Sequence, residues 1–449
     1  ALCSVASSAD HVGPIMVSDA GTASNAQPGG SALGGVIRQI AGQTAMLFSG
    51  FATAQVCAFL RNAIFAHALS RGDFGIAATI LLTMQLLETL AELGSEKLIV
   101  QADDGASRAV VGTAQSFLLI RGVVTAAMLL AAAHPLAAFF KIPEAAPAFM
   151  AVALAPLMRG FLNLDMQRAQ RALNNRPYVM VEVLPQIFAL VVTPLALWFE
   201  PSFAAVVIVA VVQAGAALLV SHCAASERID ATWDPAVARR MFAFAWPIWL
   251  SALPVVAVYH ADRILIGRLI DMEAVAGYSA AFLITMVPGM IVGKVGNAVL
   301  LPLLANVKHE REVFTARLQM MLVAVSLLAA LYAIAFALIG GPVLTLAFGA
   351  AYSDLHLVVA LLALSWAVRM LQLVPGLALL AVGRTQALLL TGCVRACGLL
   401  PAYWAIAGGY GIAGVAAVAV LAECAALGFI SWRTRRLLRS APSSALATA

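Results

Sequence analysis

Residues 202–221 read SFAAVVIVAVVQAGAALLVS, a run of 20 residues that contains no charged side chain. A helix needs about 20 apolar residues to cross the hydrocarbon core of a bilayer, and in lipid it satisfies its own backbone hydrogen bonds. The strands of a membrane β-barrel alternate in hydrophobicity over about ten residues, and this run is too long and too continuous for that pattern. The stretch therefore predicts a membrane-spanning helix.

Runs of the same kind follow one another along the chain with short breaks. Of the 449 residues, 62% are hydrophobic and 11% are charged, whereas soluble domains carry about 25% charged residues. We therefore expect an all-α integral membrane protein with about 12 transmembrane helices. The predicted spans are 44–66, 75–100, 110–133, 146–166, 178–199, 202–221, 241–267, 276–304, 314–340, 354–381, 384–406 and 411–433.

Lysine and arginine are distributed unevenly between the two sides of these spans. Basic residues at the ends of the spans are counted here with the adjoining loops. Of the 27 residues, seventeen then lie in the leader, the even-numbered loops and the tail, four in the odd-numbered loops, and six deeper inside the spans. Cytoplasmic loops carry an excess of basic residues, so both termini are predicted to be cytoplasmic. The same bias accounts for the net charge of +5 without a nucleic-acid partner.

The two halves of the chain contain an internal repeat. At a shift of 202 residues, Gly75-Ile-Ala-Ala78 falls on Gly277-Tyr-Ser-Ala280, and Arg61 falls on Arg263. Chance similarity between Leu- and Ala-rich helices is the alternative, but the shift stays constant across two successive helices. A repeat of six helices predicts two six-helix lobes related by a pseudo-two-fold axis along the membrane normal. The expected organisation is a disordered leader (1–36), an N-terminal lobe (37–228), a C-terminal lobe (229–433) and a basic cytoplasmic tail (434–449).

Three groups of residues carry a resemblance to a known family. They are ALSRGDFG at 68–75 with AELG at 91–94, DRILIG at 262–267 with AGYSA at 276–280, and GGYGIAGVAA at 408–417. In this order and spacing they make the chain resemble the polysaccharide transporter family of oligosaccharide and O-antigen-unit flippases. That family belongs to the multidrug/oligosaccharidyl-lipid/polysaccharide exporter superfamily.

The resemblance implies a transport protein, not an enzyme, in the bacterial cytoplasmic (inner) membrane. The implied substrate is an undecaprenyl-pyrophosphate-linked oligosaccharide, moved by alternating access for the biosynthesis of O-antigen, capsule or exopolysaccharide. The expected partners are this lipid-linked substrate, the bilayer, and a glycan polymerase or another assembly protein. No cofactor is implied, and coupling to a proton or sodium gradient is left open.

Basic residues inside the predicted spans indicate a path for such a substrate. An anionic pyrophosphate needs a hydrated, cationic route, because lipid alone imposes a large desolvation cost. Arginine binds phosphate bidentately and stays charged, and Arg61-Asn62 is similar to the cavity-lining pattern on the family's first helix. Snorkelling to headgroups is the alternative for Arg61 and Arg263, which lie near the ends of their helices. The candidate substrate-binding residues are Arg61, Arg121, Arg159, Arg263, Lys294 and Arg369.

Acidic residues are candidates for gating or ion coupling. Glu92 and Lys294 occupy equivalent places in the repeat, where they either pair and lock one state or face the cavity separately. Glu423, midway along the last span, is either a proton- or cation-coupling site or a hydrogen-bonded structural carboxylate. Structural ion pairs with Asp165, Glu182 or Glu423 are the alternative for the arginines of the spans. The candidate gating or coupling residues are Glu92, Asp262 and Glu423.

Two other classes of function remain open. An organic-cation antiporter of the same superfamily would favour carboxylates and aromatic rings in its cavity, whereas here basic groups outnumber acidic ones inside the spans. A membrane glycan polymerase or glycosyltransferase needs a sizeable outer loop, and the outer loops 67–74, 134–145 and 341–353 are short. Neither the cysteines nor the histidines show the spacing of metal ligands, so no metal site is predicted.

Overall fold

The computed structural model describes residues 30–92, 95–102, 104–172, 174–307, 309–384 and 386–440. These residues form helices and turns and contain no β-strand, which confirms the predicted all-α class. The chain divides into a short unit, residues 1–44, and a large unit, residues 45–449, to which the contacts below belong. Positions 1–29 of the predicted leader and 441–449 of the predicted tail lie outside the described residues.

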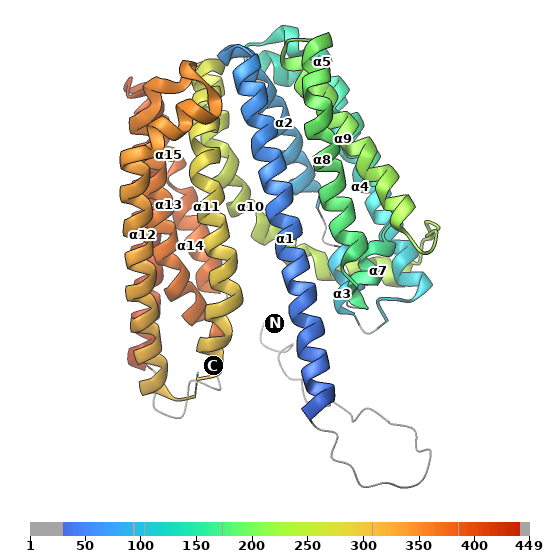
Figure 1. The fold of residues 1–449 in the computed structure, drawn as a ribbon, viewed down its shortest axis with the longest axis vertical. Helices are drawn as coiled ribbons and strands as arrows, with labels where there is room; N and C mark the ends of the chain where they lie inside the picture. Colours follow the sequence, from blue (N-terminus) through green and yellow to red (C-terminus); the bar gives the residue numbers. More distant parts are fainter. Residues whose placement is uncertain are drawn as a thin grey trace. The chain divides into compact units, whose positions relative to one another are not determined.

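Both halves of the described chain consist of long apolar helices (Figure 1). Nine described helices are long and apolar enough to cross a membrane, and a bent pair, Pro143–Gly160 with Asp165–Arg171, makes a tenth span. Helices α1 and α10 are as long as these spans but are not among the helices that meet both criteria; counted with them, the long segments number about 12. The first half comprises α1 (Gly30–Ala68), α2 (Arg71–Ala91), α3 (Ser95–Gln101), α4 (Arg108–Phe139), η1 (Pro143–Ala145), α5 (Ala146–Val152), α6 (Leu154–Gly160), α7 (Asp165–Arg171), α8 (Arg176–Phe199) and α9 (Phe203–Ala224). The second half comprises α10 (Pro235–Leu269), α11 (Met272–Ala305), α12 (Arg311–Phe348), η2 (Ala350–Leu355), α13 (His356–Ala381), α14 (Gln386–Ala396), α15 (Leu399–Ala407) and α16 (Gly411–Ser440).

The helices pack into two six-span lobes. In the N lobe, α1–α9, helix α8 packs along α9 and α4 packs against α6. In the C lobe, α10–α16, helix α13 packs against α11, α12 and α16. In Figure 1, α11, α12 and α13 lie side by side, in agreement with their mutual contacts.

Short polar residues start the helices that carry the repeat. The Ser70 hydroxyl accepts the backbone N–H of Asp73 at 3.0 Å at the start of α2. The Asp271 carboxylate accepts the N–H of Ala274 at 2.7 Å at the start of α11. Such caps satisfy backbone donors that have no partner within the helix. Equivalent helices of the two lobes therefore begin with equivalent side-chain chemistry.

The lobes meet where α2 crosses the start of α11. A Cβ atom on Gly75 would lie 1.8 Å from the carbonyl oxygen of Met272, and one on Gly277 would lie 3.0 Å from Nη2 of Arg71. The two glycines of the 202-residue repeat thus both lie where one lobe touches the other, and at Gly75 only a missing side chain permits this approach. We call this contact the lobe junction and define it by Arg71, Phe74, Gly75, Met272, Gly277, Phe348, Tyr352 and Asp354.

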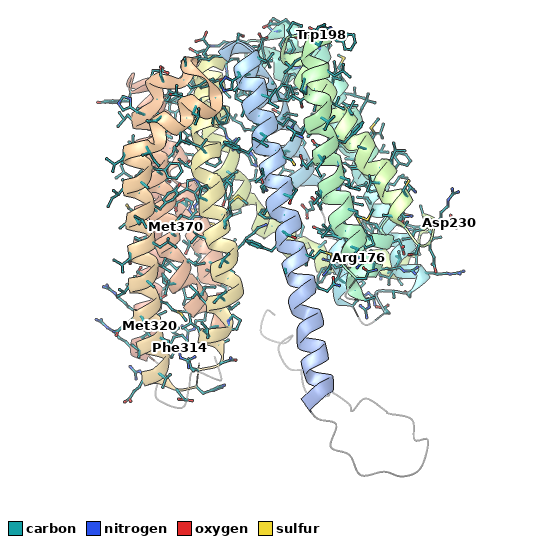
Figure 2. The ribbon with its side chains drawn as sticks, viewed as in Figure 1. Arg176, Trp198, Asp230, Phe314, Met320 and Met370 are labelled. Atoms are coloured by element: carbon teal, nitrogen blue, oxygen red, sulfur yellow. The ribbon has the colours of Figure 1, made fainter. Side chains whose placement is uncertain are left out.

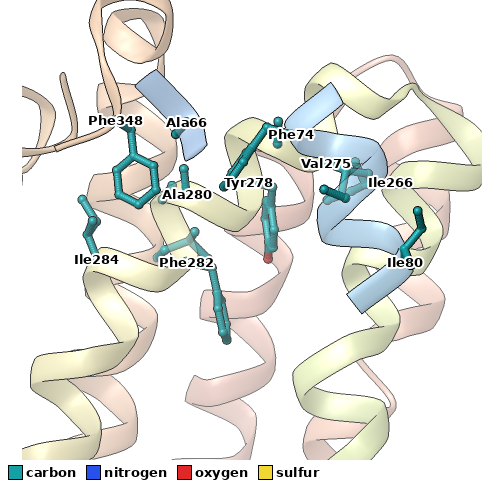
Figure 3. Close-up of a cluster of buried hydrophobic side chains, with 14 of the residues drawn as sticks. Ala66, Phe74, Ile80, Ile266, Val275, Tyr278, Ala280, Phe282, Ile284 and Phe348 are labelled. Atoms are coloured by element: carbon teal, nitrogen blue, oxygen red, sulfur yellow. The ribbon is translucent and has the colours of Figure 1, made fainter. Parts of the chain in front are cut away.

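Aromatic side chains at or just after the ends of α4 and α12 pack against the other lobe. The rings of Phe348 and Tyr352 each lie 6.4 Å from the ring of Phe74. In the reverse direction, Phe140 lies against Gly267, whose added Cβ would be 3.2 Å from the ring. Each lobe therefore places an aromatic side chain against a helix of the other lobe, as expected for a pseudo-two-fold relation. Figure 3 shows Phe74 and Phe348 in this buried cluster.

The opposite end of α10 packs against the N lobe. Nη2 of Arg240 lies 2.8 Å from the Asp104 carboxylate, and this hydrogen bond lowers the pKa of Asp104 below its ordinary value. The segment before α10 is fixed on α4, because Thr232 donates its N–H to the carbonyl of Gly112 at 3.2 Å. Helix α10 therefore contacts both lobes, and the boundary predicted at residues 228 and 229 stays a prediction.

Candidate functional site

A cavity of about 830 Å³ lies in the C lobe between α10, α11, α13, α14 and α16. Three basic side chains line it, Lys294, Arg369 and Arg395, and none of its described lining residues is acidic. Tyr259, Asn297 and Gln372 supply further polar groups. Most of the remaining lining is apolar, including Leu373, Leu377, Leu380 and Leu388. The cavity thus combines a cationic part with an apolar wall.

Behind one wall, two arginines share a single carboxylate. Arg369 donates from Nε to Glu423 Oε1 at 2.9 Å and also from Nη2 to the same oxygen. Arg395 donates from Nε to Glu423 Oε2 at 2.9 Å and from Nη2 to Gln372 Oε1 at 2.6 Å. Gln372 completes the set by donating from Nε2 to Glu423 Oε2 at 2.8 Å. We call Arg369, Gln372, Arg395 and Glu423 the guanidinium cluster.

Helix geometry brings the members of the cluster together. Arg369 and Gln372 are three residues apart on α13 and so share one face of that helix. Arg395 lies in the last turn of α14, and Glu423 lies in the interior of α16. Gly398 follows α14, and a Cβ there would lie 2.6 Å from the Cβ of Ala422, so this glycine allows close approach beside Glu423. Figure 2 labels Met370, the neighbour of Arg369, on α13.

The cluster carries more positive than negative charge. Arginine stays protonated in proteins, so two guanidinium groups face one carboxylate. Glu423 is 2% exposed, and a buried carboxylate requires such partners. The Arg369 guanidinium also lies over the rings of Tyr259 at 4.9 Å and Trp366 at 4.6 Å. Its Nη1 atom is buried, and no hydrogen bond joins it to another described residue.

Lys294 links the cavity to the N lobe. Its Nζ atom lies 2.9 Å from the ring centroid of Phe51 on α1. Glu92, the predicted counterpart of Lys294, caps α2 by donating its N–H to Thr89, whereas α11 continues through Lys294. The two repeat positions therefore differ in local structure.

The predicted pair Arg61 and Arg263 occupies two separate sites. Arg61 donates from Nη1 to Gln186 Oε1 at 3.0 Å and to Gln213 Oε1 at 2.6 Å inside the N lobe. Arg263 donates to the carbonyl of Tyr259 and lies 4.7 Å from the ring centroid of Phe282. Neither arginine is among the described residues that line the 830 Å³ cavity.

Asp262 lines a second, smaller cavity of about 60 Å³. Its carboxylate accepts the hydroxyl of Tyr278 at 2.7 Å. Arg369, Arg395 and Glu423 line this small cavity too. The predicted gating residues Asp262 and Glu423 therefore line the same small cavity.

The two remaining candidates make ion pairs inside the N lobe. Nη1 of Arg159 lies 2.6 Å from Glu88, and Nη1 of Arg121 lies 3.5 Å from Glu96. Neither partner was among the acids considered from the sequence. Charge pairing across helices leaves no period in the sequence of either helix, so residue pattern alone does not reveal it.

The candidate residues taken from the sequence did not include Arg395 or the uncharged polar residues of the site. Gln372 bridges Arg395 and Glu423, and Gln186 with Gln213 holds Arg61. The available signal was a glutamine inside an apolar run, as at Gln213. Among the residues that the structure describes, no group of three or more His, Cys, Asp or Glu side chains could hold a metal ion.

The sequence matches a known family, and the fold is similar to solved transporter structures. Residues 64–357 match the family described as polysaccharide biosynthesis protein, and no curated protein sequence matches the chain. The fold is similar to an inward-facing multidrug resistance MATE family transporter of the MOP superfamily, at 12% identity over 86% of this chain and 96% of that one, with a TM-score of 0.70. It is also similar to the lipid II flippase MurJ in an inward closed conformation, at 10% identity over 87% of each chain, with a TM-score of 0.71. A MOP superfamily transporter from Pyrococcus furiosus, described as having a binding pocket of reverse polarity, is 14% identical over 90% of this chain and 96% of that one, with a TM-score of 0.61.

Proposed function

Because the chain belongs to the polysaccharide biosynthesis protein family, we propose that it translocates undecaprenyl-pyrophosphate-linked oligosaccharides across the bacterial cytoplasmic membrane. The translocated units would serve the assembly of O-antigen, capsule or exopolysaccharide. In this proposal the chain moves its substrate by alternating access and changes no covalent bond. The two-lobe fold, which it has in common with MATE transporters and MurJ, supports a transport role.

The sign of the cavity charge carries the proposal. Lys294, Arg369 and Arg395 line the cavity, and no described lining residue offsets them with a carboxylate. A pyrophosphate is the anionic part of the proposed substrate, and arginine donors match its oxygens in geometry and charge. The exposed parts of Arg369 and Arg395 are the first contacts that we assign to it.

The apolar wall suits the remainder of such a substrate. Leu373, Leu377, Leu380 and Leu388 continue the cavity away from the guanidinium cluster. A polyprenyl chain needs contact with side chains or lipid, whereas a glycan needs water and polar groups. In the proposal the anionic head binds the basic end, and the isoprenoid follows the apolar side.

The N lobe would contribute to the same path. Arg61 and Arg159 lie in that lobe, and Lys294 of the C lobe lies over the ring of Phe51 on α1. We propose that these groups meet the substrate after it enters between the lobes. With both termini in the cytoplasm, the lobe junction would lie at the outer face and would close this state to the outside.

The organic-cation antiporter remains the second candidate because the MATE fold is a close structural match. A cation would find Tyr259 and Trp366 in the cavity wall, but also three basic groups. Like charges at this separation repel, so the wall favours an anion. Drug-resistance assays and glycan-export assays on the same strains separate the two candidates.

Deletion and complementation test the proposal. Loss of the protein should leave oligosaccharide on its lipid carrier and reduce surface glycan, and the wild-type chain should reverse both effects. Arg369→Gln removes the charge and shortens the side chain but leaves a polar amide in its place. Because a hydrogen bond to a charged group contributes about 1.5–3 kcal/mol, we expect export to fall by about tenfold to a hundredfold.

Arg317→Gln is the matched control. Arg317 is also basic and lies on a spanning helix, but it donates to the carbonyl of Leu303 at 2.9 Å and does not line the cavity. Both variants should reach the membrane in wild-type amounts, which immunoblotting measures. No accumulation of lipid-linked glycan in the deletion strain would reject the function, and normal export by Arg369→Gln would reject the cavity assignment.

A further inference from the structure

Glu423 lies behind the arginines of the guanidinium cluster as seen from the cavity. Arg369 and Arg395 line the 830 Å³ cavity, whereas Glu423 does not. All three line the separate 60 Å³ cavity. A molecule in the large cavity would therefore meet the guanidinium groups and not the carboxylate.

The carboxylate of Glu423 is fully engaged. Oε1 accepts two donors of Arg369, and Oε2 accepts Nε of Arg395 and Nε2 of Gln372. These contacts hold the side chain in place at 3% exposure. Glu423 therefore acts on an anion in the cavity through the arginines and through its charge, not through contact.

Both arginines keep part of the side chain open, since each is 19% exposed and each lines the large cavity. The rings of Tyr259 and Trp366 restrict the plane of the Arg369 guanidinium. An anion against these two guanidinium groups would share them with Glu423. Since like charges on one guanidinium repel each other, each anion weakens the binding of the other.

We propose that Glu423 is a built-in counter-anion that limits how tightly the cavity holds an anionic head group, so that the head group can leave. This role rests on the proposed function, because it presumes a pyrophosphate in the cavity. In the empty state Glu423 also prevents repulsion between Arg369 and Arg395. Glu423 is thus a positioning residue: it lowers the affinity of the cavity for the anion and thereby speeds the release of the anion.

The proposal predicts that affinity follows the charge of the cluster in both directions. Glu423→Gln removes the negative charge and should tighten anion binding. Gln372→Glu adds a negative charge at a position that already accepts Nη2 of Arg395 at 2.6 Å, and it should weaken binding. Glu423→Asp keeps the charge and should bind much as the wild type does. A unit charge a few ångströms from the anion, at an effective dielectric constant of about 20, corresponds to at least tenfold in each direction.

Inorganic pyrophosphate is the probe, titrated calorimetrically into the purified full chain in lipid nanodiscs. We expect Glu423→Gln to bind about tenfold tighter or more, Gln372→Glu about tenfold weaker, and Glu423→Asp within about threefold of the wild type. Size-exclusion profiles and melting curves establish that each variant is folded. A structural role alone would not produce opposite changes in two folded variants.

The outcomes separate this inference from the function on which it rests. If the wild type binds pyrophosphate and folded Glu423→Gln binds no tighter, the counter-anion role is wrong and the function stands. If Glu423→Gln does not fold, Gln372→Glu decides, and unchanged binding by that variant overturns the role. If the wild type binds no pyrophosphate, the assignment of the cavity to a pyrophosphate head fails first. Export by Glu423→Gln should also be slower than wild type despite tighter binding.

Discussion

Replacing Gly75 with alanine should force the lobe junction apart. The new Cβ atom would lie 1.8 Å from the Met272 carbonyl oxygen, whereas a carbon and a carbonyl oxygen in contact lie about 3.3 Å apart. Helices α2 and α11 must therefore separate locally by roughly 1.5 Å. The obstacle is backbone, which cannot rotate away as a side chain does.

The free-energy cost of Gly75→Ala is the cost of overpacking a tight contact. Added methyl groups in a tight contact cost about 1–3 kcal/mol, and backbone against backbone places this case near about 3 kcal/mol. That penalty applies only to the state with a closed junction, so it reduces the population of that state by about a hundredfold relative to open states. The ring contacts of Phe74 with Phe348 and Tyr352 would loosen together with it.

Pulsed electron–electron double resonance measures the width of the lobe junction as a distance between two spin labels. Spin labels at Ala68 and Ser353, both exposed beside the junction, report its width in a cysteine-free background. We expect a single short distance in the parent and a longer, broader distribution in Gly75→Ala. Gly428→Ala is the control, because a Cβ there meets nothing within 4 Å. An unchanged distance in Gly75→Ala, with normal export, would refute the role of this glycine.

Three further predictions concern stability and pH. Phe348→Ala empties a fully buried site at the junction and should lower the free energy of unfolding in detergent by about 3–5 kcal/mol; a loss below about 1 kcal/mol would contradict it. Asp354→Asn removes an ion pair of 3.3 Å whose carboxylate side chain is 62% exposed, so the loss should be at most about 1 kcal/mol, and a larger loss would reveal a partner other than Arg71. Arg240 lowers the pKa of Asp104 through a hydrogen bond, so the contact stabilises the fold above the ordinary pKa of 3.8 and loses this effect as the pH falls through the lower folded value. The difference in melting temperature between wild type and Asp104→Asn should shrink over that acidic range, and a difference that is independent of pH would argue against the contact.

Apolar runs predicted most spans well because hydrophobicity is a property of the local sequence. The run at 202–221 became α9, Phe203–Ala224, and the run at 178–199 became α8, Arg176–Phe199. Breaks inside runs were not visible in the same way. The predicted span 75–100 is divided after Ala91, where Glu92 bonds back to Thr89. The predicted span 384–406 is divided between Ala396 and Leu399.

The repeat was informative because it records a spatial relation in the sequence. Gly75 and Gly277, aligned at a shift of 202, both lie where the lobes touch. A glycine needed for close approach cannot be replaced without moving the helices, so the contact leaves a mark at both positions. Family membership, confirmed by the match over residues 64–357, agrees with the resemblance seen in these same stretches.

The sequence by itself therefore determined the class of the protein, its helical spans and the two-lobe repeat, since each depends on runs of residues or on a constant shift. It also indicated that basic groups lie inside the spans. Only the tertiary structure decided which of them share a cavity: Lys294, Arg369 and Arg395 do, whereas Arg61 and Arg263 bond within separate lobes. The physical reason is that a charge in a span is expensive to bury and takes partners from other helices, here Glu423 and Gln372. Those partners are distant in sequence, and only packing brings them together.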